Sequence, residues 1–140
     1  MVDNFIKTSS FNESAFYLNN IKQLSNTMKK VKCKKIILFG VSYALLDFAE
    51  KYPIKMKNLI VIETGGMKGR KKEISRDELH QRLQSGFGVE NIHSEYGMTE
   101  LFSQAYAIKD GKFKNPPWMK TFIRDMNNPL FVSKKGKGAI

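Results

Sequence analysis

The pattern of apolar and polar positions predicts two buried strands joined by a helix. Residues 34–40 (KKIILFG) form a continuous apolar run, the pattern of a parallel strand buried on both faces, and residues 58–63 (NLIVIE) predict a second buried strand. Residues 42–51 are expected to be helical, with Ser42 as the capping hydroxyl and Pro53 just beyond the helix end. This order predicts a right-handed parallel unit.

Apolar side chains at helical spacing predict a further helix on each side of this unit. The first helix covers residues 14–31 and should lie against the sheet. The second begins at Ser75, which forms a serine-x-x-glutamate capping box with Glu78, and ends near Gly86 and Gly88, where positive φ angles are expected. Its core face is formed by Leu79, Leu83 and Phe87.

The remaining sequence gives shorter signals. Residues 89–94 predict a third strand, and residues 99–108 predict a helix capped by Thr99. Residues 122–125 and 131–140 predict strands around a turn at 127–129. The predicted fold is α/β: a parallel-sheet β-α-β-α-β unit with flanking helices and a C-terminal strand-rich segment, all within one domain.

Composition and charge narrow the classes of function. The 140 residues are 41% hydrophobic, enough for a core, and 24 Lys and Arg against 13 Asp and Glu give a net charge of +11. A surface with this charge attracts anions such as nucleic acid, anionic lipid or phosphorylated small molecules. Because no apolar stretch approaches the ~20 residues that span a bilayer, we expect no membrane span and a cytoplasmic location.

Cysteine and histidine usage points away from a structural metal or disulfide. Cys33 is the single cysteine, and the two histidines, His80 and His93, lack the spacing of zinc ligands. A lysine block around Cys33 could lower its pKa, but a structural role is the simpler interpretation. No partner for either histidine is evident from the sequence, so both are interpreted as structural.

Two unusual stretches follow predicted strands, at the sheet edge where open parallel sheets bind ligands. The first, TGGMKGR (64–70), differs from a nucleotide P-loop because no lysine is followed by Ser or Thr at a helix start. Its adjacent Gly65 and Gly66 would let a ligand approach the backbone, and Lys68 and Arg70 could contact phosphate. Alternatively, the stretch is a glycine turn with solvated bases.

The second stretch is HSEYGMTE (93–100). Tyr96 offers a flat ring for stacking, Gly97 removes a side chain, Thr99 supplies a hydroxyl, and Glu100 is an oxygen ligand suited to Mg²⁺. Together these groups suit an adenine nucleotide. The alternatives are a core tyrosine, a turn glycine, a helix cap and a first-turn carboxylate favoured by the helix dipole. Glu95 stays unassigned between a functional and a surface role.

The residues YGMTE in this stretch resemble the Tyr-Gly-x-Thr-Glu signature of the adenylate-forming superfamily. The order of ETGG, the Ser75 helix and NIHSEYGMTE also matches that superfamily. Over residues 34–140, including LFGVSYALLDFAE and PPWMKTFIRD, the chain is similar to the bacterial acyl-protein synthetases, the long-chain-fatty-acid–protein ligases of luminescence-type fatty acid reductase systems.

This resemblance implies ATP-dependent activation of a fatty acid, or another carboxylic acid, to acyl-AMP and transfer of the acyl group to a thiol. It implies that Gly65 and Gly66 line the adenine, that Tyr96 stacks on it, that Thr99 contacts phosphate and that Glu100 holds Mg²⁺. The implied cofactors are ATP and Mg²⁺. The implied partners are the carboxylate substrate and an acyl-reductase or acyl-acceptor protein.

The sequence also departs from the family pattern. The Ser/Thr/Gly-rich phosphate loop expected upstream is absent, the ribose-binding aspartate and the C-terminal lysine would lie beyond Ile140, and Cys33 does not match the acyl-accepting cysteine. We therefore expect residues 1–140 to be a partial adenylate-forming domain, a fragment of a longer enzyme that is inactive alone. The alternatives are a subunit completed by another polypeptide, and a basic α/β module whose lysine blocks bind nucleic acid without catalysis.

Overall fold

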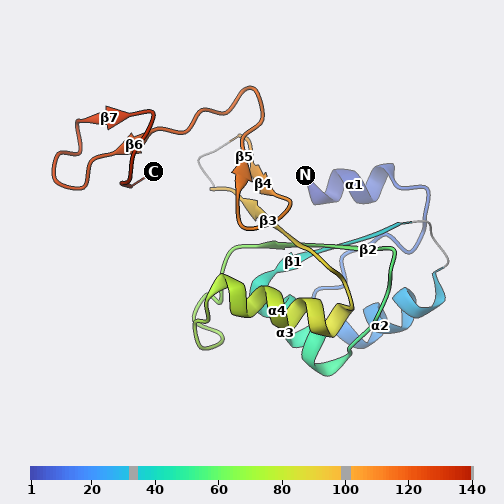
Figure 1. Cartoon of the computed structure of the whole chain (residues 1–140). Helices are drawn as coiled ribbons and strands as arrows, with labels where there is room; N and C mark the ends of the chain where they lie inside the picture. Colours follow the sequence, from blue (N-terminus) through green and yellow to red (C-terminus); the bar gives the residue numbers. More distant parts are fainter. Residues whose placement is uncertain (32–34, 99–101, 140) are drawn as a thin grey trace.

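The computed structural model describes residues 1–31, 35–98 and 102–139, and the fold within these ranges is mixed α/β. Strands β1 to β5 form one sheet in the order β1-β2-β3-β4-β5, and β6 pairs with β7 in a separate hairpin (Figure 1). The helices are α1 (Val2–Thr8), α2 (Ile21–Lys30), α3 (Ser42–Lys51) and α4 (Arg76–Phe87). The strands are β1 (Ile36–Val41), β2 (Leu59–Thr64), β3 (Ile92–Tyr96), β4 (Ala105–Ala107), β5 (Phe113–Lys114), β6 (Ile123–Arg124) and β7 (Val132–Ser133).

The predicted parallel unit is confirmed. β1 pairs with β2, and β2 with β3, in parallel, and α3 and α4 are the connecting helices. β4 and β5 extend this sheet in antiparallel orientation. Among the described residues, no helix combines the length and the apolar character that crossing a membrane requires.

The prediction that β1 is buried on both faces is wrong. The helices α3 and α4 lie on one side of the sheet, and the short α1 lies on the other (Figure 1). Side chains therefore alternate: Leu38 is buried beneath the helices, whereas Ile37 on the opposite face is 64% exposed. The apolar run reflects a strand with one well-covered face and one partly covered face.

The core lies between the sheet and the α3–α4 layer. The rings of Phe48 and Phe87 lie 5.5 Å apart at an angle of 52°. Gly86 was expected to take a positive φ, but only Gly88 does so, at φ 64° as the cap of α4. Gly86 instead lies at the α3–α4 contact, where an added Cβ would come within 2.7 Å of the Ala49 Cβ. Its missing side chain lets the two helices approach.

Helix starts depend on local capping. Ser75 accepts a hydrogen bond from the Glu78 N–H at 3.2 Å, as predicted, but the Glu78 carboxylate pairs with Arg82 and leaves the capping box half formed. The helix predicted from residue 14 begins only at Ile21, because the Asn20 side chain caps it by accepting from the Gln23 N–H.

The helix predicted over residues 99–108 is wrong in its described part. Residues 105–107 instead form β4, which pairs with β3 and buries Ala105 and Ala107. Thr99, its predicted cap, lies outside the described residues. The predicted C-terminal hairpin is confirmed, although its strands have only two residues each. From residue 119 to residue 139 no side chain is buried.

Candidate functional site

Three strand ends lie side by side at the carboxyl edge of the parallel sheet. Thr64, the last residue of β2, pairs with Val41 on one side and with Glu95 on the other. Ser42, Gly65 and Tyr96 follow these three paired residues directly. The glycine-rich stretch and the Tyr-Gly stretch are therefore neighbours in space, although about 30 residues separate them in the sequence.

The glycine corner after β2 is exposed. Gly65 has a φ of 74°, a backbone conformation that favours glycine. Gly66 is different, because an added Cβ there would meet no heavy atom within 4 Å. The described protein atoms therefore leave space beside Gly66 for another molecule to approach the backbone.

Two predicted phosphate-contacting cations lie near this corner. Lys68 is exposed, and its Cε would lie 3.5 Å from a Cβ added at Gly65. Arg70 places its guanidinium 5.0 Å from the ring centre of Tyr43, in the first turn of α3. Such a cation–π contact holds the guanidinium beside the edge while leaving its N–H groups free to donate.

The Tyr-Gly stretch is only partly available to a ligand. Tyr96 is half-buried, its ring meets the Phe113 ring edge-on at 6.0 Å, and its hydroxyl donates to Met98 Sδ. Gly97 is exposed, and an added Cβ there would lie 3.2 Å from Gln104 Cγ. Thr99 and Glu100, the predicted phosphate and metal contacts, lie outside the described residues.

A buried carboxylate lies directly behind the glycine corner. Glu63 is 2% exposed, and its closest hydrogen bond comes from the Ser42 hydroxyl at 2.7 Å. That hydroxyl also lies 3.1 Å from the Gly65 carbonyl oxygen. Ser42 was expected to cap α3, but Val41 holds the cap position without a side-chain bond, and the Ser42 hydroxyl turns inward instead.

His80 on α4 joins the same cluster and so has partners that are not evident from the sequence. Its Nε2 atom lies 3.3 Å from Ser94 Oγ and 3.6 Å from Glu63 Oε1. Burial acts to raise the pKa of Glu63, but the donors on His80, Ser94 and Ser42 more than offset it and lower the pKa below the usual glutamate value. The carboxylate is therefore charged at neutral pH, although it is buried.

Glu95, unassigned from the sequence, is held on the opposite face of the same edge. It accepts a hydrogen bond from the Tyr106 hydroxyl at 2.8 Å and one from Thr64 Oγ1 at 3.3 Å. Burial, together with this bond to Glu95, raises the pKa of Tyr106 to about 12, so the hydroxyl stays protonated at neutral pH. The contact ties β2, β3 and β4 together.

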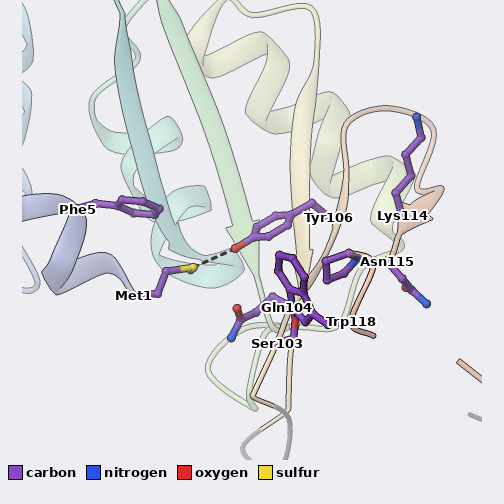
Figure 2. A pocket seen from close by; sticks show the side chains of 9 residues that line it. Met1, Phe5, Ser103, Gln104, Tyr106, Lys114, Asn115 and Trp118 are labelled. Atoms are coloured by element: carbon purple, nitrogen blue, oxygen red, sulfur yellow. Dashed lines mark hydrogen bonds between the residues drawn. The ribbon is translucent and has the colours of Figure 1, made fainter. Parts of the chain in front are cut away.

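Tyr106 also borders a shallow hollow of about 410 Å³ that is open to solvent (Figure 2). Met1, which precedes α1, and Phe5 of α1 form one side of the hollow, and Trp118 lies across from them. The indole N–H of Trp118 donates to Ser103 Oγ at 2.8 Å. The lining is mainly apolar, and the hollow lies on the side of the sheet away from α3 and α4.

The described residues do not by themselves form a metal site. Within them, no group of three or more His, Cys, Asp or Glu side chains is arranged to hold a metal ion. The carboxylates of Glu63 and Glu95 at this edge already accept hydrogen bonds. The expected Mg²⁺ contact thus depends on Glu100.

The structure brings together Gly65, Gly66, Tyr96 and Gly97, the predicted nucleotide-binding residues that it describes. It adds the buried Glu63 cluster, which sequence reasoning missed. One signal for this cluster was present: a buried strand that alternates Leu59, Val61 and Glu63 directs its carboxylate inward. Comparisons with protein-family models, with curated proteins and with solved structures found no match to this chain.

Proposed function

We propose that the chain binds an adenine nucleotide with Mg²⁺ at the carboxyl edge of its parallel sheet. In this proposal it supplies that part of the site for ATP-dependent activation of a fatty acid, or another carboxylic acid, to acyl-AMP. The acyl group then passes to a thiol of an acceptor protein or small molecule. The supporting observation is that the Gly65–Gly66 corner lies beside the Tyr96–Gly97 stretch, through the Thr64–Glu95 pair.

The local geometry is compatible with a nucleotide. The space beside Gly66 allows a flat base or a phosphate to approach the backbone. Tyr96 is half-buried and fixed at its edge by Phe113, so its exposed part offers a rigid surface for stacking. Lys68 and Arg70 at the same edge provide positive charge for the phosphates.

Each residue has a role in positioning or charge compensation. The glycine corner admits the nucleotide, Tyr96 orients the adenine, and Lys68 and Arg70 attract the phosphates so that the acid can reach the α-phosphorus. By resemblance, Thr99 would contact phosphate and Glu100 would hold Mg²⁺. When bound, Mg²⁺ would neutralise charge that develops on the phosphates as pyrophosphate leaves.

Nucleotide binding is expected in an amide NMR titration of the full chain with ATP and MgCl₂. Saturable shifts should appear at Gly65, Gly66 and Gly97. Tyr96→Ala should weaken the affinity by about tenfold, because base–aromatic stacking contributes about 1–3 kcal/mol. Tyr17→Ala, which changes a half-buried tyrosine outside the sheet, is the matched control and should bind like the wild type.

A second titration tests acid activation. A long-chain acyl sulfamate of adenosine, a stable analogue of acyl-AMP, should bind at least ten times more tightly than AMP, and an acetyl analogue should fall between them. Equal affinities would contradict acid activation. Absence of saturable ATP binding at millimolar concentration, combined with DNA binding that weakens steeply with salt, would favour the nucleic-acid alternative.

A further inference from the structure

Glu63 occupies a position on a face of β2 that is otherwise buried and apolar. Its side chain points from β2 into the α3–α4 layer, as do those of Leu59 and Val61. Removing a carboxylate from water costs several kcal/mol, and well-packed apolar residues that replace buried ion pairs often leave stability unchanged or raise it. Apolar packing of this layer alone therefore does not explain the charge of Glu63.

The contacts of Glu63 connect β2 with β1, β3, α3 and α4, the strands and helices around the carboxyl edge of the sheet. In the sheet it pairs with Gly40 of β1 and Ser94 of β3. The Ser42 hydroxyl, at the start of α3, lies 2.7 Å from its carboxylate and 3.1 Å from the Gly65 carbonyl oxygen. Ser94 lies two residues before Tyr96, and its hydroxyl reaches His80 of α4.

We infer that Glu63 is a positioning residue: its buried carboxylate, held by Ser42, Ser94 and His80, fixes the Gly65–Gly66 corner relative to Tyr96. It thereby sets nucleotide affinity without contacting the nucleotide. The effect on affinity rests on the proposed function, whereas the effect on the position of the glycine corner does not. His80 is the titratable group that contacts Glu63 in the described structure, and the other two partners are uncharged.

The first test uses no nucleotide. The amide signals of Gly65 and Gly66 should move in an acid titration as Glu63 gains a proton, and this movement should be absent in Glu63→Gln. The folded-state pKa of Glu63 lies below its usual value, so the movement should occur at lower pH than for exposed glutamates. Because folding lowers the pKa of Glu63, its charge stabilises the folded state. This stability is present above the usual glutamate pKa and is lost as the pH falls through the folded pKa.

The second test separates positioning from stability. Glu63→Leu should keep the urea midpoint at pH 7 close to that of the wild type, because leucine continues the buried row of Leu59 and Val61 and Ser94 keeps His80 as a partner. Its ATP affinity, and that of Glu63→Gln, should fall by about tenfold. Glu90→Gln, at an exposed glutamate of the same chain, is the control for both measurements.

The outcomes are distinct. If the wild type binds no ATP, the proposed function fails, and the acid titration still decides whether Glu63 positions the corner. Unchanged titration of Gly65 and Gly66 in Glu63→Gln would overturn the inference. So would wild-type ATP affinity in both Glu63 variants.

Discussion

Phe87→Ala is expected to reduce the free energy of unfolding by about 3–5 kcal/mol. Phe87 is 0% exposed, and its ring contacts that of Phe48 where α3 and α4 meet. Truncation would remove buried aromatic surface, leave a cavity between the helices and the sheet, and remove the favourable ring pair. Urea denaturation followed by circular dichroism at 222 nm would measure the loss.

Phe102→Ala provides the matched control, because Phe102 is 108% exposed. This change should stay within about 0.5 kcal/mol of the wild type. Phe87→Leu, which keeps most of the apolar volume, should cost less than about 1.5 kcal/mol. A loss below about 1 kcal/mol for Phe87→Ala would mean that the ring is not part of the core.

Gly86→Val is expected to have the second large effect, a reduction of the free energy of unfolding by about 3 kcal/mol. Even one added carbon would lie 2.7 Å from the Ala49 Cβ and 3.2 Å from the Ala49 carbonyl oxygen, so α3 and α4 must separate. The change in helix propensity from glycine to valine is small and slightly favourable, so the loss would come from the helix contact. The same urea experiment would measure it.

Gly66→Val is the control for this prediction, because an added Cβ at Gly66 meets nothing within 4 Å. It should change stability little. Gly86→Ala should cost less than Gly86→Val, and adding Ala49→Gly should recover part of that cost by removing the opposing Cβ. An unchanged midpoint for Gly86→Val would show that the two helices are farther apart than described.

The parallel unit was predictable because its signals are local and strong. The apolar runs around Leu38 and Val61 are typical of strands, and Ser75 marks a helix start because its hydroxyl accepts a hydrogen bond from the N–H of Glu78, three residues later. Strand order then placed the ends of β2 and β3 at one edge. The residues that follow those strands could thus be assigned to a common site from the sequence.

The errors arose where distant contacts decide the structure. Residues 105–107 alternate alanine with tyrosine, and β3 stabilises them as a strand by offering an edge to pair with. Ser42 looks like a cap from its neighbours alone, but the charge of Glu63, 21 residues later, draws its hydroxyl inward. No local pattern links Glu63 to His80, because one lies on a strand and the other on a helix face.

The C-terminal hairpin is expected to be much less stable than the core of the same chain. Its strands pair through β6 and β7, but Leu130 near the turn is 92% exposed and no side chain from residue 119 to residue 139 is buried. Local opening of the hairpin therefore costs far less free energy than unfolding of the core. A protease that cuts after lysine would therefore cleave the native molecule at Lys134 and Lys135. Phe87→Ala, which destabilises the core, would leave the rate of this cleavage unchanged.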